Sequence, residues 1–152
     1  MTVRSQARAL VLQCLYELDF TDHTFEHALS AHVEGTIVDD GEPNYGLGLS
    51  PKGVKFARTL GTAVEKRLEE LDTLAAKYAP EWPFDQISAI DRNILRLAIC
   101  ELLFTKDAPG KVVINEAVEL AKQFGGDTSP RFINGVLGAV ISHRESHEKS
   151  AA

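Results

Sequence analysis

Four of the five histidines stand in two pairs whose spacing would suit a metal ion. His23 and His27, and His143 and His147, are each four residues apart on predicted helices, so both rings of a pair could reach one ion. Neither pair has a third ligand of the right kind close by on a rigid element. We therefore interpret these side chains as solvated surface histidines, and we expect neither a metal site nor a cofactor.

A carboxylate on an apolar helix face is the second candidate for chemistry. Glu101 lies on such a face in the segment 88–105, where burial would raise its pKa towards that of a general acid. No second titratable group stands beside it, so we interpret it as a structural acceptor between helices. Asn115 and Asn134, inside apolar helical runs, are interpreted in the same way, as buried polar connectors.

Recognisable catalytic motifs are absent from the sequence. It has no nucleophile elbow of the form Gly-x-Ser-x-Gly, no phosphate-binding loop that ends in Gly-Lys-Ser/Thr, no His-Glu-x-x-His and no cluster of cysteines. We therefore predict no catalytic residues and a protein that binds other molecules.

The segment 124–132, Phe-Gly-Gly-Asp-Thr-Ser-Pro-Arg-Phe, could bind a phosphate at a helix start. It offers capping side chains followed by Pro130, and the first turn of a helix presents free N–H groups and partial positive charge. Arg131 adds a guanidinium, and Phe132 a ring on which a base could stack. The alternative is an ordinary corner between two helices with Phe132 in the core.

The charge balance limits how such a site could work. The chain carries 22 acidic against 16 basic side chains, a formal charge of −6. A protein that relied on non-specific affinity for nucleic acid would normally be basic. Binding of RNA or DNA would therefore need a local patch and the help of a partner. Arg4 and Arg8 are the only charged side chains before Glu17 and form one such patch.

Membrane insertion and export are not expected. No stretch approaches the roughly 18 apolar residues of a membrane helix, and the N-terminus lacks the apolar run of a secretory signal. We predict a cytoplasmic protein without a membrane partner. Cys14 and Cys100 lie in apolar helical patterns and are interpreted as buried, reduced thiols, with a disulfide as the alternative.

The elements that position these residues are all predicted to be helices. Apolar residues recur at helical spacing in six segments, which cover residues 3–19, 23–32, 50–78, 88–105, 111–124 and 129–143. Ser50-Pro51 and Ser88 mark helix starts, and Pro80 forces a stop. No segment shows sustained two-residue alternation, so we predict an all-α fold without a sheet.

One glycine-rich, acidic segment interrupts the helices. Residues 34–50 contain Gly35, Gly41, Gly46 and Gly48 and no regular period, which predicts a mobile surface loop. The roughly 33 residues before it are too few to fold alone. We therefore expect one domain over 1–145, and a disordered tail at 146–152.

Three runs of the sequence resemble the NusB family: DRNILRLAICEL at 91–102, VINEAVELAK at 113–122 and FINGVL at 132–137. Gln6-Ala7-Arg8 and Gln13-Cys14-Leu15-Tyr16 are similar to the first helix of that family. The resemblance covers about residues 4–30 and 50–142. It implies the NusB-type fold of two packed helical bundles, with about six or seven helices.

The resemblance also implies a transcription antitermination factor. Such a factor binds the single-stranded boxA element of nascent ribosomal RNA together with NusE, a small-subunit ribosomal protein, and links it to the elongating RNA polymerase complex. By position, the RNA-binding residues would be Arg4, Gln6, Arg8, Thr128, Ser129, Arg131 and Phe132. Tyr16 and Asp91 would face NusE. The few N-terminal arginines predict weak RNA affinity until NusE is bound.

Two alternatives remain open at this point. NusB-like domains also occur fused to ribosomal RNA methyltransferases, so the chain could be an RNA-targeting module of that kind. It could also be a self-associating, structural homodimer that hides its partner surface.

Overall fold

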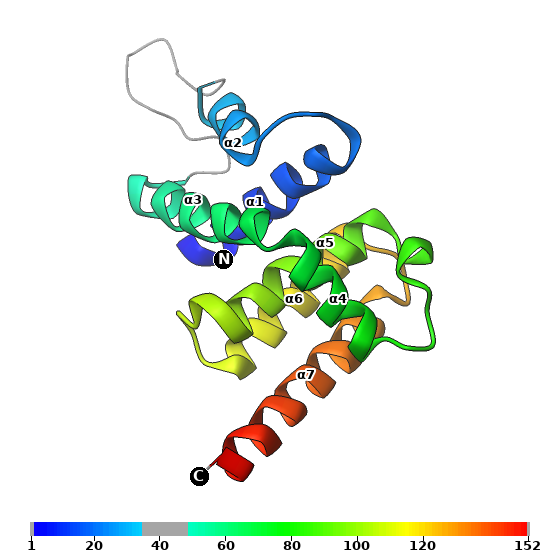
Figure 1. Ribbon diagram of the computed structural model, residues 1–152. Coiled ribbons are helices and arrows are strands. Elements are labelled where there is room, and N and C mark those ends of the chain that lie inside the picture. Colours follow the sequence, from blue (N-terminus) through cyan, green and yellow to red (C-terminus); the bar gives the residue numbers. More distant parts are fainter. Residues whose placement is uncertain (1, 35–48, 152) are drawn as a thin grey trace. The chain divides into compact units, whose positions relative to one another are not determined.

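The structure, a computed structural model, describes residues 2–34 and 49–151, which are mostly helical (Figure 1). Within these ranges seven α-helices, a 3₁₀ turn (η1) and a π turn (η2) follow one another: α1 (Val3–Phe20), α2 (Phe25–Glu34), α3 (Pro51–Lys66), α4 (Leu68–Tyr78), η1 (Phe84–Gln86), α5 (Ala89–Cys100), η2 (Glu101–Thr105), α6 (Gly110–Phe124) and α7 (Ser129–Ala151). The described part contains no β-strand, so the predicted all-α class is confirmed. Most of the loop predicted at 34–50 lies outside the described residues.

The helices form two compact units, Met1–Lys66 and Arg67–Ala152, which we call the N-terminal unit and the C-terminal unit. That they make a single domain over 1–145 stays a prediction. Within the described residues, no helix combines the length and the apolar character needed to cross a membrane.

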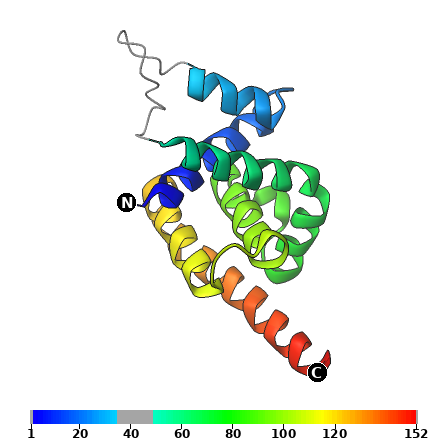
Figure 2. The same ribbon diagram turned by 90° about the vertical axis from the view of Figure 1, so that its left-hand side faces the viewer.

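In the N-terminal unit, α1 packs against both α2 and α3 (Figure 2). The hydroxyl of Thr2 accepts a hydrogen bond from the N–H of Ser5 at 3.0 Å, and so caps α1 close to its predicted start. Large apolar side chains of all three helices are buried, among them Leu10, Leu15, Phe25, Leu29, Leu60 and Val64. Apolar residues at helical spacing therefore form most of the buried faces of these helices.

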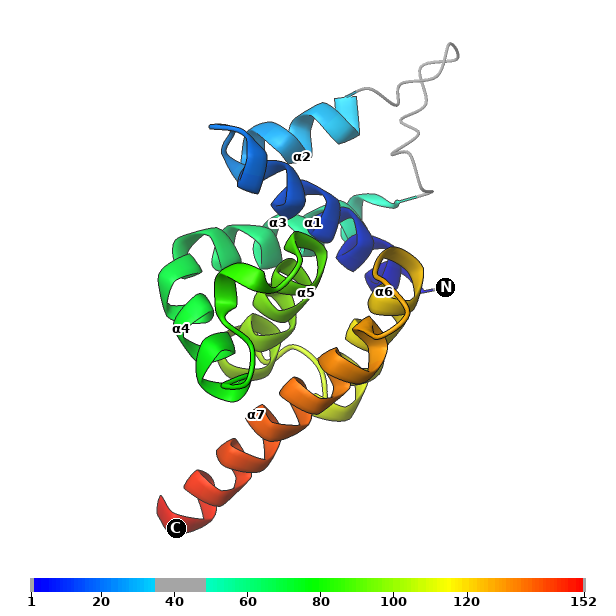
Figure 3. The same ribbon diagram turned by 90° about the vertical axis from the view of Figure 1, so that its right-hand side faces the viewer.

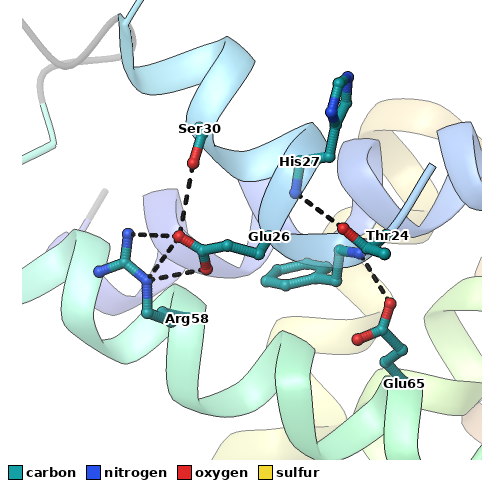
Figure 4. A network of polar contacts seen from close by, with 7 residues as sticks. Thr24, Glu26, His27, Ser30, Arg58 and Glu65 are labelled. Carbon is teal, nitrogen blue, oxygen red and sulfur yellow. Dashed lines mark hydrogen bonds and ion pairs between the residues drawn. The ribbon is translucent and has the colours of Figure 1, made fainter.

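The first turn of α2 is held by polar contacts, one of them to α3 (Figure 4). The hydroxyl of Thr24 accepts from the N–H of His27 at 3.1 Å, and the Glu65 carboxylate of α3 accepts from the N–H of Phe25 at 2.7 Å. Both acceptors satisfy N–H groups that a helix start leaves unpaired. As a result α2 begins at Phe25, two residues later than predicted.

A second contact between α2 and α3 lies on the surface. Arg58 donates from Nε to a Glu26 oxygen at 3.0 Å, and the Ser30 hydroxyl donates to the same carboxylate at 3.4 Å (Figure 4). The hydrogen bond from Arg58 holds the pKa of Glu26 below its ordinary value. Because both partners are exposed, the pair orients α2 along α3 and adds little to stability.

The closest approach of α2 to α3 depends on a glycine. A Cβ atom at Gly61 would lie 1.8 Å from Cζ of Phe25, whose ring is fully buried. Glycine ordinarily weakens a helix interior, but at Gly61 the missing side chain is what lets Phe25 pack there.

In the C-terminal unit, α5 packs against α4, α6 and α7 (Figure 3). It buries side chains on several faces: Ile94, Leu95, Leu97, Ala98 and Ile99. A helix that is apolar nearly all round is expected to occupy such a central position. Next to it, α6 and α7 pack along each other.

The predicted helix 50–78 is two helices. It ends as α3 at Lys66 and restarts as α4 at Leu68, although neither glycine nor proline stands at the break. Arg67 leaves the helical backbone with φ −121° and ψ 19°, and its guanidinium lies 4.2 Å from the centre of the Phe104 ring. The break separates a half that packs on α1 from a half that packs on α5, so tertiary packing causes it.

The last helix is longer than predicted. Instead of fraying after His143, α7 continues to Ala151, where the sequence predicted a disordered tail. The added residues include Glu145, Glu148, Lys149 and Ala151, all good helix formers, and no glycine or proline interrupts them.

The prediction for two asparagines was wrong. Asn115 and Asn134 are exposed, because α6 and α7 each bury one face and these residues lie on the other. The buried connector is Asn93 of α5, which donates to the Ala89 carbonyl at 2.8 Å and accepts from Arg96 Nη1 at 2.9 Å. Arg96 in turn pairs with Asp72 of α4, with Nε 2.6 Å from Oδ1.

Both cysteines are buried free thiols, as predicted. Burial raises the pKa of Cys14 and of Cys100 to about 12, so both remain protonated at neutral pH. Glu101 is also buried, at the start of η2.

Candidate nucleic-acid interface

The start of α7 is fixed by Ser129. Its hydroxyl accepts from the N–H of Gly126 at 3.0 Å and donates to Oδ2 of Asp91 at 3.1 Å, and the residue is only 4% exposed. The carbonyl of Thr128 accepts from the N–H of Phe132 at 3.1 Å and closes the first turn. Of the predicted RNA-binding residues, Ser129 is therefore buried and supports this turn, whereas Thr128 is exposed.

Asp91 connects this turn to the start of α5. Its N–H donates to the hydroxyl of Ser88 at 3.2 Å, which confirms Ser88 as the predicted cap. One carboxylate oxygen bonds to Ser129, and the other, Oδ1, is buried without a hydrogen-bond partner. Burial raises the pKa of Asp91, and hydrogen bonds with Ser129 and Ser88 offset part of that rise. A residue predicted to face the protein partner thus touches one predicted to bind RNA.

A hollow of about 330 Å³ opens between these two helix starts. We call it the recognition hollow, and its lining residues are Trp82, Gln86, Ile87, Ser88, Asp91, Thr128, Arg131 and Phe132. It combines two aromatic rings, a guanidinium, hydroxyls and a carboxyl group. Such a set can bind a nucleobase by stacking and hydrogen bonds, and an adjacent phosphate by charge.

The aromatic side chains of the recognition hollow are already paired. The rings of Trp82 and Phe132 meet nearly edge to face, with centroids 6.4 Å apart and planes at 80°. Trp82 is 56% exposed, whereas Phe132 is half-buried, so the ring predicted for stacking is partly a core residue. Sequence reasoning missed Trp82 and Gln86. The one signal for Trp82 was its place between Pro80 and Pro83, in a segment that cannot be helical.

The N-terminal arginines lie in the other unit and share one ring. The guanidinium carbons of Arg4 and Arg8 are 4.8 Å and 5.2 Å from the centre of the Phe56 ring. Arg4 is exposed, Gln6 is half-buried, and Arg8 is only 2% exposed. The predicted RNA-binding residues therefore form two sets, one in each unit, and Arg4 is the accessible cation of the N-terminal set.

Tyr16 belongs to an exposed aromatic pair near the end of α1. It is 41% exposed and Phe20 is 64% exposed, with ring centroids 4.9 Å apart. Two large exposed rings side by side are typical of a protein-binding surface.

The histidines predicted to lie on the surface are exposed where the structure describes them. Nδ1 of His23 is 3.0 Å from a Glu17 oxygen, and the rings of His23 and His27 are 4.2 Å apart. His143 is exposed, and the side chain of His147 lies outside the described residues. Across the described part of the chain, no group of three His, Cys, Asp or Glu residues could hold a metal ion.

An exposed hollow lined by aromatic and cationic side chains in an all-helical protein is compatible with a nucleic-acid-binding adaptor. The model of the NusB family matches residues 5–142. A transcription antitermination protein NusB from Dehalococcoides mccartyi is 47% identical over 139 residues, 91% of this chain and 90% of that protein. The chain therefore belongs to the NusB family: it is a transcription antitermination protein and not an enzyme.

Solved structures agree on the fold. The structure of NusB from T. maritima superimposes with a TM-score of 0.74 at 34% identity, over 89% of this chain and 87% of that one. A chain from a complex of the antitermination factors NusB and NusE with double-stranded RNA superimposes with a TM-score of 0.78 at 24% identity, over 94% of this chain and 98% of that one. The predicted NusB-type fold of two helical bundles is confirmed.

Proposed function

We propose that this protein binds the single-stranded boxA element of nascent ribosomal RNA jointly with NusE, and so links the transcript to the elongating RNA polymerase complex. The observation that carries the proposal is the recognition hollow, where Arg131 stands beside the rings of Trp82 and Phe132. This role would place the protein in the cytoplasm.

In this proposal, the protein acts by binding and positioning the RNA and not by catalysing a reaction. A base stacks against Trp82 or Phe132, Arg131 neutralises a neighbouring phosphate, and the first turn of α7 adds its partial positive charge. The hydrogen bond from Ser129 to Asp91 connects the two helix starts that border the hollow. Arg4 and Gln6, with Arg8 behind them, provide a second contact from the N-terminal unit.

NusE supplies what this acidic chain lacks. With a net charge of −6, the protein repels RNA at long range, and its own cations are few. We place NusE on the exposed pair Tyr16 and Phe20 and near Asp91. A chain of this fold has been solved in complex with NusE and double-stranded RNA, which supports a partnership with NusE.

The test is a titration of boxA RNA and a scrambled RNA, with and without NusE. We expect weak binding alone and much tighter, boxA-selective binding with NusE. Arg131→Ala should weaken binding and reduce the slope of log K against log salt by about 0.7, the value for one lost phosphate contact of a single strand. If NusE adds no affinity, the proposal of joint binding is wrong. If the salt slope of Arg131→Ala is unchanged, the proposed role of Arg131 is wrong.

Self-association is the second candidate, and the exposed rings of Tyr16 and Phe20 favour it. A homodimer that uses this pair would block NusE. Light scattering of the chain alone and with NusE distinguishes the two: a dimer that NusE cannot dissociate supports the structural form, and a monomer that forms a heterodimer supports the proposal.

A further inference from the structure

A second hollow, of about 380 Å³, lies in the C-terminal unit among α4, the end of η2 and α7. We call it the basic hollow, and its lining residues are Leu74, Lys77, Tyr78, Leu103, Lys106, Val140, His143 and Arg144. Two of these residues are lysines, one is an arginine and one is a histidine, and none carries a carboxylate. In a chain with a net charge of −6, such a concentration of cations favours an anionic ligand.

Lys106, which lines the basic hollow, has an unusual backbone conformation. Lys106 is the one non-glycine residue of the described chain with positive φ, 52°, and its N–H donates to the Glu101 carbonyl at 2.9 Å, which closes the π turn η2. Glycine or asparagine is the usual residue in this conformation. Both π turns and left-handed residues are concentrated at functional sites.

The other cations are held in place by their neighbours. Arg144 donates from Nη1 to the Leu102 carbonyl at 2.8 Å, which fixes its side chain against η2. The ring of Tyr78 meets that of His143 edge to face at 5.6 Å, and Nζ of Lys77 lies 5.4 Å from the centre of the same tyrosine ring. Cations fixed in this way lose less side-chain entropy when an anion binds.

The basic hollow and the recognition hollow each share lining residues with a third hollow, which is also lined by Glu81. This third hollow, of about 320 Å³, shares Tyr78 with the former, and Trp82, Arg131 and Phe132 with the latter. All three belong to the C-terminal unit and follow α7. From Phe132 to His143 the helix rises by about 16 Å at ~1.5 Å per residue, a span that a few nucleotides of a single strand can follow.

We propose that the basic hollow binds backbone phosphates of the RNA strand whose base occupies the recognition hollow, so that the strand follows α7 from its first turn to Arg144. This inference rests on the proposed function. It extends the RNA surface to Lys77, Lys106, His143 and Arg144, and it predicts that affinity depends on RNA length beyond the recognised base.

The test compares Lys77→Gln/Lys106→Gln with a matched control, Lys111→Gln/Lys122→Gln, which removes two exposed lysines of α6 that line none of the hollows. Each protein, in complex with NusE, is titrated with minimal boxA RNA and with RNAs extended by roughly six nucleotides on the 5′ or the 3′ side. For one of the extended RNAs, the first variant should bind about tenfold more weakly and lose about 1.4 of the salt slope, which corresponds to two phosphates. On minimal RNA it should match the control.

A second variant separates charge from folding. Lys106→Gly removes the cation and suits the left-handed backbone, so it should fold at least as well as the original protein and still bind the extended RNA more weakly. The inference is overturned if both lysine variants behave like the control on both extended RNAs while the original protein binds them. If the original protein with NusE binds no boxA RNA, the proposed function fails and the inference fails with it.

Discussion

At the residue scale, Asp91 illustrates how a capping residue can also set the pH dependence of stability. Burial raises its pKa above the ordinary value, so the folded state binds the proton more tightly than the unfolded chain does. The stabilisation from that proton is complete below the unfolded pKa and is lost as pH rises through the folded one. Above the folded pKa the carboxylate is ionised, and this stabilisation is absent.

Asp91→Asn should therefore raise stability at pH 7 by a fraction of 1 kcal/mol, since the site is partly solvated and the effect is screened. The amide cannot ionise but can still accept from Ser129. The advantage should disappear at about pH 3, where the aspartate itself is protonated. Thermal unfolding at the two pH values measures both effects. A variant that is less stable at pH 7 would show that the negative charge at the start of α5 outweighs its burial.

Single residues also show what could and what could not be predicted from the sequence. Ser88 and the start of α7 could be predicted, because a cap depends on residues three positions away. Trp82, Tyr78 and Lys106 could not be assigned to a binding surface, because their contacts come from helices distant in sequence. Phe132 could be identified, but its half-buried state could not.

At the scale of elements, the presence of the helices could be predicted from apolar periodicity, whereas one helix boundary is set by tertiary packing. The helix predicted over 50–78 breaks at Arg67 because its two halves pack on different helices, α1 and α5. Likewise the role of Gly61 in α3 depends on a phenylalanine 36 residues away in sequence. Local propensity cannot reveal either cause.

Gly61→Ala should destabilise the protein by about 2–3 kcal/mol, because a Cβ there overlaps the ring of Phe25 and forces α2 away from α3. The control is Gly138→Ala in α7, where a new Cβ meets nothing within 4 Å. There the better helix propensity of alanine should stabilise by about 0.5–1 kcal/mol. Urea unfolding measures both changes. Equal effects of the two substitutions would mean that the glycine is dispensable between α2 and α3.

At the scale of the whole molecule, the negative net charge limits the affinity for RNA. A chain with a formal charge of −6 holds few cations in position for RNA, and they belong to two units: Arg4 in one, and Arg131 with the basic hollow in the other. The family resemblance identified both sets of predicted RNA-binding residues but not the basic hollow, because nothing in the local sequence connects Lys77 to Lys106 or Arg144.

If both units bind one RNA strand, losses from the two sets should add. With NusE present, Arg4→Ala and Arg131→Ala should each reduce the salt slope by about 0.7 and the double variant by about 1.4, with additive binding free energies. Arg58→Ala is the control, since Arg58 is an exposed arginine of the N-terminal unit that pairs with Glu26 outside both sets. Anisotropy titrations of labelled boxA RNA over a range of salt concentrations supply the slopes of the original protein and of all four variants. If the double variant binds RNA no more weakly than Arg131→Ala alone, Arg4 does not belong to the RNA surface. The RNA would then be bound by the C-terminal unit and NusE alone.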